Sequence, residues 1–186
     1  MNVFLLFYFQ SMKKNLLLLL SFALFHCAQA QDAAFSRIPD AQVKGLDGKK
    51  MQTADLSNNG KPMVISMWAT WCKPCIRELN AISDMYIDWQ DETGVKLVAI
   101  SIDDSRNATK VGPFVNGAGW EYEVYIDENQ DFKRLLNVNT IPHTFLVNGK
   151  GEIVWQHNGY TAGDEDELYE LIKKVAAGEP LSSASH

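Results

Sequence analysis

The sequence has 186 residues, of which 46% are hydrophobic and 22% are charged, and its formal net charge at pH 7 is −6. This length suits one domain with its own hydrophobic core, and the composition excludes collagen-like and disordered chains. A net negative surface repels nucleic acid and anionic lipid headgroups, so we expect no nucleic-acid partner.

Residues 1–30 have the pattern of an export signal that precedes the folded domain. Lys13 and Lys14 form a short basic region, and residues 15–25 form a continuous apolar run. Small residues then lead to a cleavage position after Ala30. We therefore expect a signal peptide at residues 1–30, and a soluble protein in the periplasm or another exported compartment after cleavage.

Three details of this segment affect its interpretation. Met12 is a more sensible start than Met1, because it places the basic region at the beginning of the signal. The apolar run is shorter than the roughly 20 residues that span a bilayer, although an uncleaved membrane anchor is the alternative. Cys27 follows His26 rather than a small residue, so we expect it to be lost with the signal and not lipidated. The folded domain is then predicted at residues 31–186.

Strands and helices alternate along this predicted domain. Residues 43–51 predict a small hairpin with a turn at Asp47-Gly48, and the apolar residues 62–68 predict a strand that is buried on both faces. Residues 31–40 and 179–186 are polar and are expected to be loose ends. Later predicted elements are a strand at residues 95–102, a helix at 108–115 that is interrupted near Gly112-Pro113, a strand at 122–126, a short helix at 132–136, a hairpin of residues 144–148 and 153–156, and a helix that starts near Asp164.

An amphipathic helix is predicted from Cys75 onward, and Gly94 ends it. Pro74 is tolerated at its beginning, because amides of the first turn lack intrahelical partners. Its apolar stripe consists of Cys75, Leu79, Ile82, Tyr86 and Trp89, at steps of three and four residues. With the other elements, this helix predicts an α/β sandwich around a mixed sheet.

The segment Trp71-Cys72-Lys73-Pro74-Cys75 joins the buried strand to this helix. A thiol at a helix N-terminus faces unpaired amide protons and the positive end of the helix dipole, which favours the thiolate. Lys73 adds a positive charge, so Cys72 is the candidate nucleophile. Cys75, one turn inside the helix, is the candidate resolving cysteine, and Pro74 stiffens the loop. This chemistry requires no cofactor. A disulfide that closes so small a loop adds little stability, so a structural role is a poor explanation.

This motif, together with the later segment Thr140-Ile141-Pro142-His143-Thr144-Phe145, resembles the thioredoxin superfamily and, more closely, its exported TlpA/ResA-like branch. The resemblance covers residues 38–178. It implies a thioredoxin-like three-layer α/β sandwich whose mixed central sheet carries an N-terminal hairpin and an inserted helix and strand at residues 105–126. It also implies a thiol–disulfide oxidoreductase that acts on protein substrates.

The resemblance also implies roles for individual residues. Pro142 corresponds to a cis-proline that faces the disulfide, and Ile141 would offer backbone hydrogen bonds to an extended substrate segment. Trp71 and Trp68 would form an apolar rim for substrate, with core packing as the alternative, which is favoured for Trp68. Together with Lys73 and Pro74, Trp71 and Ile141 are the expected substrate contacts.

Glu78 is the expected proton carrier. Cytosolic thioredoxins have a buried Asp and a Lys at positions that hold Ser66 and Ala99 in this sequence. The ResA-like branch instead has a Glu three residues after the second cysteine, which corresponds to Glu78. The resemblance implies that Glu78 transfers the Cys75 proton during exchange. The alternative is a solvated carboxylate on the helix surface.

Several other functions are compatible with parts of the pattern. A copper-binding metallochaperone could use the two thiolates, with His143 and His157 as the nearby candidate ligands, whereas zinc requires four ligands. A peroxiredoxin-type peroxidase requires Pro-x-x-x-Thr-x-x-Cys, and Thr70 is too close to Cys72 for that spacing. The intact cysteine pair argues against an interaction domain without chemistry.

The direction of electron flow is open from the residues alone, because the same site oxidises or reduces according to its reduction potential. The resemblance implies a monomeric reductant that receives electrons from a membrane thiol carrier and serves cytochrome c maturation or the thiols of exported proteins. An oxidising disulfide donor is the alternative.

Overall fold

The structure is a computed structural model that describes residues 37–181, so the predicted signal peptide and Cys27 lie outside the described residues. Within this range, seven strands form one mixed sheet in the order β2-β1-β5-β4-β3-β6-β7. The elements are β1 Gln42–Gly45, β2 Lys50–Gln52, a 3-10 turn at Thr53–Asp55, β3 Met63–Trp68, α2 Lys73–Thr93, β4 Lys96–Ser101, α3 Ala108–Ala118, β5 Glu123–Ile126, α4 Asp131–Leu135, β6 His143–Val147, β7 Ile153–Asn158 and α5 Asp164–Ala176.

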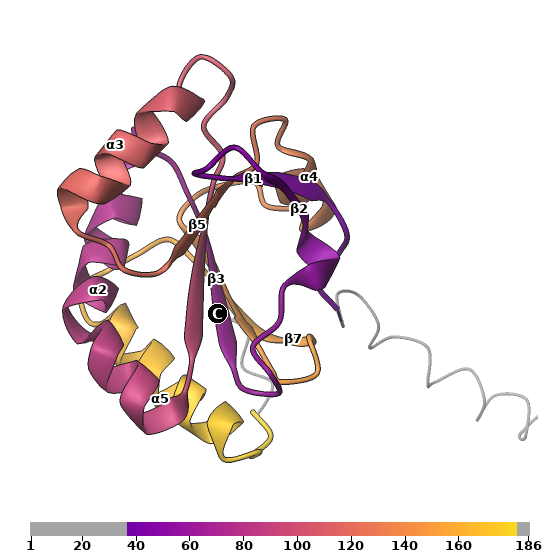
Figure 1. Ribbon diagram of the computed structural model, residues 1–186. Helices are drawn as coiled ribbons and strands as arrows, with labels where there is room; N and C mark the ends of the chain where they lie inside the picture. Colours follow the sequence, from indigo (N-terminus) through magenta and orange to yellow (C-terminus); the bar gives the residue numbers. More distant parts are fainter. Residues whose placement is uncertain (1–36, 182–186) are drawn as a thin grey trace, which may run out of the picture. The chain divides into compact units, whose positions relative to one another are not determined.

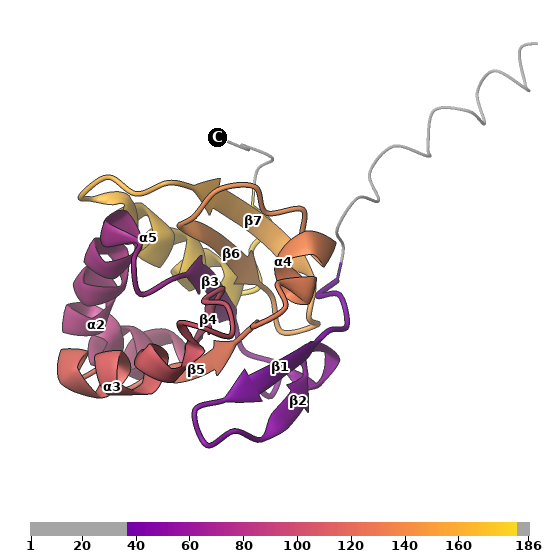
Figure 2. The ribbon, with the colours of Figure 1, turned by 90° about the horizontal axis from the view of Figure 1, so that it is seen from above.

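The helices cover both faces of the sheet and make three layers. Strands β3, β4 and β5 are parallel, and β6 and β1 flank them as antiparallel neighbours. Right-handed crossovers between consecutive parallel strands place α2 and α3 on the same face. Figures 1 and 2 show α5 on this face as well and α4 on the opposite face. The predicted three-layer α/β sandwich is therefore confirmed.

The hairpin and the insertion predicted for the N-terminal half are also present. Strands β1 and β2 pair antiparallel, with Val43 opposite Met51, and Gly48 in the turn has a φ of 80°. Helix α3 and strand β5 form the inserted unit, and β5 lies between β4 and β1. The insertion thus separates the hairpin from the central parallel strands.

Strand β3 and helix α2 form the centre of the domain. All six residues of β3 are buried, as its nearly unbroken apolar sequence predicts. The stripe from Cys75 to Trp89 is buried along α2, and the helix ends at Gly94, which has a φ of 67°. Only a residue without a Cβ adopts that backbone conformation readily. Helix α2 therefore ends at the residue that the sequence indicates, whereas it begins at Lys73, two residues before the predicted start.

Helix α3 differs from the prediction of an interruption near Pro113. It continues through Pro113 to Ala118, and Gly119 ends it with a φ of 70°. Proline removes one backbone donor from the helix. Val111 and Val115 are 0% and 4% exposed, and their burial holds the helix on the sheet despite that loss.

The described part of the predicted N-terminal loose end is bound to the domain. The Ile38 amide donates to the Gly151 carbonyl at 3.2 Å, and Thr53 Oγ1 donates to the Pro39 carbonyl at 2.6 Å. The expectation that residues 37–40 are loose was therefore wrong, because two distant turns supply partners that the local sequence does not reveal.

No helix between residues 37 and 181 is long and apolar enough to cross a membrane.

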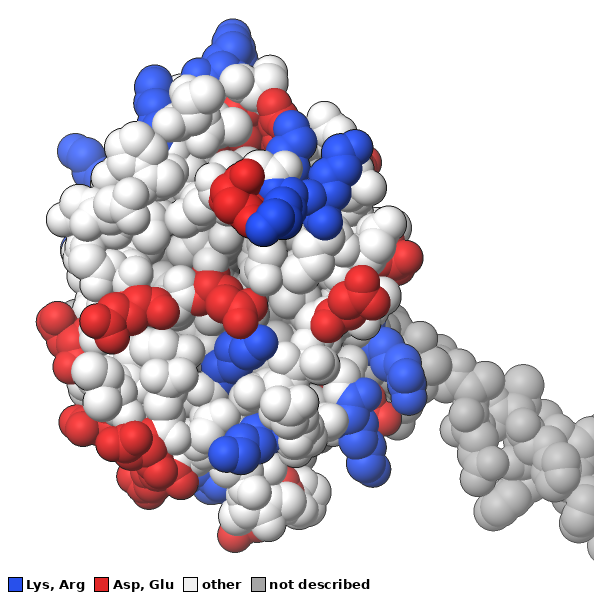
Figure 3. All heavy atoms as spheres, viewed as in Figure 1, with Lys and Arg blue, Asp and Glu red and all other residues white. Residues whose placement is uncertain are grey.

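Charge is unevenly distributed on the face shown in Figure 3. Acidic side chains gather over α2 and the end of α5, and basic ones lie over the β1–β2 hairpin and near α3. In the first turn of α5, four consecutive residues from Asp164 to Glu167 are acids. Negative charge at a helix N-terminus complements the helix dipole.

Candidate active site

Cys72 and Cys75 form a disulfide at the N-terminus of α2, with an S–S distance of 1.98 Å. Cys72 is the N-cap residue, and its Sγ accepts a hydrogen bond from the Cys75 amide at 3.3 Å. Cys72 is 5% exposed, whereas Cys75 is 0% exposed. An attacking thiol therefore reaches the Cys72 sulfur more easily, as the predicted nucleophile and resolving roles require.

Pro142 lies at the same end of the sheet as the disulfide. The Ile141–Pro142 peptide bond is cis, as the resemblance implies. Strand β6 starts at the next residue, and His143 pairs with Met67 near the end of β3. Pro142 is therefore beside the point where β3 leads into the cysteine motif. Its carbonyl accepts a hydrogen bond from the Gly159 amide at 2.9 Å, which fixes the loop after β7 against it.

Glu78 is a buried carboxylate one turn after Cys75, with 5% of its surface exposed. Thr144 Oγ1 donates to its Oε1 at 2.6 Å, and Ser66 Oγ donates to its Oε2 at 3.4 Å. Burial raises the pKa of Glu78 to about 7; the two hydrogen bonds oppose this, and the negative charges of Asp164 and Glu165 add to it. The alternative of a solvated surface carboxylate is therefore wrong.

The two tryptophans of the motif have different environments. Trp71 is 61% exposed beside the disulfide and is free to contact another molecule. Trp68 is 0% exposed, and its ring lies 5.0 Å from the ring of Trp120, centroid to centroid. Trp68 therefore belongs to the core and cannot contribute to a rim. Lys73 is exposed and Pro74 is half-buried, so both are accessible beside Cys72.

The two histidines considered as metal ligands each contact another side chain. His143 Nε2 lies 3.2 Å from Gln156 Oε1, and His157 Nε2 lies 3.2 Å from Asp164 Oδ2. Burial lowers the pKa of His143. Among residues 37–181, no three His, Cys, Asp or Glu side chains are grouped so that they could hold a metal ion.

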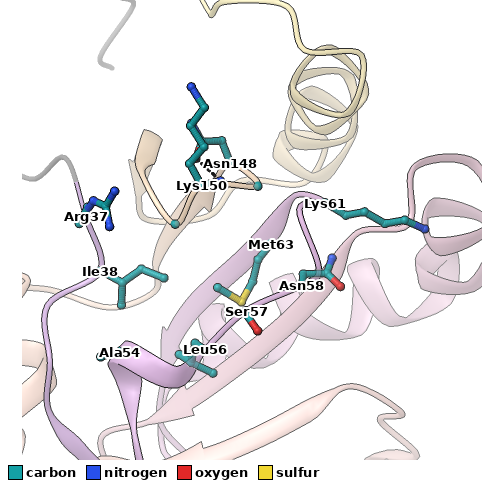
Figure 4. A pocket seen from close by; sticks show the side chains of 12 residues that line it. Arg37, Ile38, Ala54, Leu56, Ser57, Asn58, Lys61, Met63, Asn148 and Lys150 are labelled. Carbon is teal, nitrogen blue, oxygen red and sulfur yellow. Dashed lines mark hydrogen bonds between the residues drawn. The ribbon is translucent and has the colours of Figure 1, made fainter.

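A cavity of about 340 Å³ lies at the other end of β3 from the disulfide (Figure 4). Met63, at the start of β3, and the turn of the β6–β7 hairpin contribute to its wall. Lys61 extends away from it, and its ammonium lies against Gly94 at the end of α2. The cavity therefore takes no part in the chemistry of the cysteine pair.

Sequence reasoning missed two contacts of the site. Thr144 binds Glu78, and Asp103 accepts hydrogen bonds from Thr70, just before the cysteine motif. Thr144 lies near the start of an apolar strand and Asp103 lies just after the end of another. A polar residue at such a position could have marked both as candidates for the site. Which partner each one binds depends on how the strands align.

Comparisons with known proteins agree with this geometry. The family described as AhpC/TSA matches residues 35–156. Thiol-disulfide oxidoreductase ResA of Bacillus thuringiensis is 34% identical over 137 residues, which is 74% of this chain and 75% of the relative. ResA of Bacillus subtilis is 27% identical, over 77% and 76% of the two chains. The solution structure of a thioredoxin-like protein from Porphyromonas gingivalis is 50% identical, with a TM-score of 0.70 over 82% of this chain and 99% of that one.

Proposed function

The chain belongs to the AhpC/TSA family and is a thioredoxin-like thiol–disulfide oxidoreductase, and we propose that it works as a reductant of protein disulfides outside the cytoplasm. The proposal concerns the direction of exchange, the roles of the site residues and the compartment.

In the proposed cycle, the Cys72 thiolate attacks one sulfur of a substrate disulfide and releases the other as a thiolate, which takes up a proton. Cys75 then loses its proton and attacks the Cys72 sulfur, which releases the second substrate sulfur. The substrate gains two electrons and two protons, and the enzyme is left with the Cys72–Cys75 disulfide. A second dithiol must return two electrons to the enzyme before the next cycle.

The proximity of Cys75 and Glu78 in one turn of α2 is the observation that carries the proposal. Both side chains are buried, at 0% and 5% exposure, so this turn holds one negative charge more easily than two. Glu78, with its pKa raised to about 7 by burial, is suited to accept the Cys75 proton when Cys75 attacks. Burial also disfavours thiolates and hence the reduced pair, which lowers the reduction potential and supports a reductant.

The proposed substrate contacts surround the less buried sulfur. Trp71, Lys73 and Pro74 adjoin Cys72 in the chain and are accessible, and Ile141 precedes the cis bond at the same end of the sheet. We propose that an extended substrate segment binds the Ile141 backbone while Trp71 covers its apolar side chains. We propose a monomer; both cysteines, Glu78 and Pro142 come from one chain, so the proposed cycle needs no residue of a second copy.

The proposed compartment and partners follow from the predicted signal at residues 1–30 and from the ResA-like resemblance. Outside the cytoplasm, the second dithiol would be a membrane thiol carrier. Substrates would be the disulfides of apocytochrome c or of other exported proteins.

Trapping of the mixed disulfide tests the roles of the two cysteines. In Cys75→Ser, a disulfide-containing peptide should remain attached to Cys72, because the resolving thiol is missing. Cys72→Ser is the matched control and should trap no peptide. If Cys72→Ser trapped the peptide and Cys75→Ser did not, the assigned roles would be reversed.

A further inference from the structure

Asp103 is a completely buried carboxylate that the cycle above does not use. It lies two residues after the end of β4 and is 0% exposed. Its Oδ2 accepts hydrogen bonds from the Thr70 amide at 2.8 Å and from Ser101 Oγ at 2.7 Å, and its Oδ1 accepts one from Thr70 Oγ1 at 2.7 Å. Three neutral donors thus hold the carboxylate, and no ion pair within the described range includes it.

These hydrogen bonds fix the turn that presents the nucleophile. Thr70 follows the end of β3, and the Cys72 amide donates to the Ala69 carbonyl at 3.0 Å, which closes the turn around Thr70. Asp103 therefore binds Thr70, in the middle of this turn, by accepting hydrogen bonds from both the amide and the hydroxyl of Thr70. Cys72 is placed at the N-cap of α2 by this arrangement.

The carboxylate is also close enough to act on the cysteine through its charge. Consecutive Cα atoms are about 3.8 Å apart, so a group bonded to the Thr70 amide lies within roughly 10 Å of the Cys72 backbone. The Asp103 side chain is excluded from water, so solvent screens its field only weakly. A nearby negative charge disfavours a thiolate.

We propose that Asp103 is a positioning residue for the redox reaction: it fixes the turn that presents Cys72, and its charge makes the reduced cysteine pair less stable relative to the disulfide. This role of Asp103 would contribute to the proposed reducing direction, and its importance in the cell rests on that direction. The effect of Asp103 is measured as a difference between variants, whereas the direction is tested by the absolute potential of the wild type. The two can therefore fail separately.

Asp103→Asn leaves the other titratable groups at this end of the sheet unchanged. They are Lys73 and Glu78 of α2, Asp104 and Arg106 after β4, Asp127 after β5, and His143 of β6.

The test compares Asp103→Asn with Asp104→Asn in the reduced and oxidised full-length protein. Both substitutions remove one negative charge, but Asp104 is at the surface with 36% of its side chain exposed and pairs with Arg106 at 2.8 Å. The pKa of the Cys72 thiol is measured from the pH dependence of its alkylation. The equilibrium with reduced and oxidised glutathione is measured well above and well below that pKa.

For Asp103→Asn, we expect the thiol pKa to fall by about one unit, because the thiolate loses a repulsive neighbour. Above this pKa, the equilibrium should shift about tenfold toward the reduced pair, which corresponds to about 30 mV. Below it, the shift should disappear, because both thiols are then neutral. Asp104→Asn should behave as the wild type.

Any of the following results would overturn the proposal. Asp103→Asn could match Asp104→Asn, or its shift could be equal above and below the thiol pKa, which would leave Asp103 a role in the turn but none for its charge and so contradict the proposal that both act. Thr70→Val, which keeps the charge and loses one hydrogen bond, could lower the thiol pKa as much as Asp103→Asn does. If Asp103→Asn does not fold, Ser101→Ala replaces it as the test. This variant keeps the Asp103 charge but removes the hydrogen bond from Ser101 Oγ, so the charge is less compensated and the pKa of the Cys72 thiol should rise. An unchanged or lower thiol pKa would contradict the proposal.

Discussion

Thr144 donates a 2.6 Å hydrogen bond from its Oγ1 to Oε1 of Glu78, and both side chains are buried. Thr144 lies two residues after Pro142 on β6, and Glu78 lies three residues after Cys75 on α2. The contact therefore links the strand that follows the cis-proline to the helix that begins within the cysteine motif. It also fixes the carboxylate that we assign as the proton acceptor.

Replacing Glu78 with Gln should slow the resolving step. Gln keeps the size of the side chain but cannot accept the Cys75 proton, so we expect a rate loss of about a hundredfold near neutral pH. Stopped-flow measurement of mixed-disulfide resolution gives this rate. Exchange rates equal to those of the wild type across the pH range would remove Glu78 from the mechanism.

Replacing Thr144 with Val should raise the pKa of Glu78 further. The hydrogen bond from Thr144 favours the charged carboxylate and opposes the effect of burial. Its loss should shift the pH profile of exchange upward by about one unit. Thr144→Ser keeps the hydroxyl and should restore the wild-type profile. If Val and Ser gave the same profile, the hydrogen bond would have no part in setting that pKa.

Glu78 should also make the stability of the oxidised protein depend on pH. Its pKa is about 7 in the folded state against its ordinary value of 4.5, so the folded state binds more protons than the unfolded chain between these pH values. The free energy of unfolding should therefore fall as the pH rises through this window, by about 3 kcal/mol, and be fully retained below it. Denaturant unfolding at several pH values measures this. Glu78→Gln should lack this contribution, and equal slopes for both proteins would contradict it.

Replacing Trp71 with Ala should weaken substrate binding more than folding. The side chain is 61% exposed, so its loss should change the free energy of unfolding by less than about 1 kcal/mol. A large aromatic at a docking surface contributes strongly to binding. We expect KM for a disulfide-containing protein to rise about tenfold with a smaller change in kcat. An unchanged KM would show that substrate does not contact Trp71.

Local patterns were sufficient for most elements of this fold. The nearly unbroken apolar residues of β3 and the stripe along α2 identify both elements, because burial of one strand and of one helix face leaves a direct trace in residue order. Pro113 misled the prediction for α3, since local propensity does not include the burial of Val111 and Val115.

The cysteine pair was visible in the sequence, but its buried polar surroundings were not. The Thr144–Glu78 contact depends on the antiparallel register of β3 and β6, which places Thr144 opposite Ser66. Asp103 reaches Thr70 only because β4 lies beside β3 and ends at the same edge. Such contacts are set by strand alignment, which the residues of one strand alone do not specify.

The reduction potential of the Cys72–Cys75 pair tests the central claim most directly. The protein is equilibrated with graded thiol buffers, and the free thiols are trapped and counted. We predict a potential of about −270 mV or lower, which would make the pair a reductant that needs an electron supply. A value near −120 mV would make it a disulfide donor and would contradict the proposed direction of exchange.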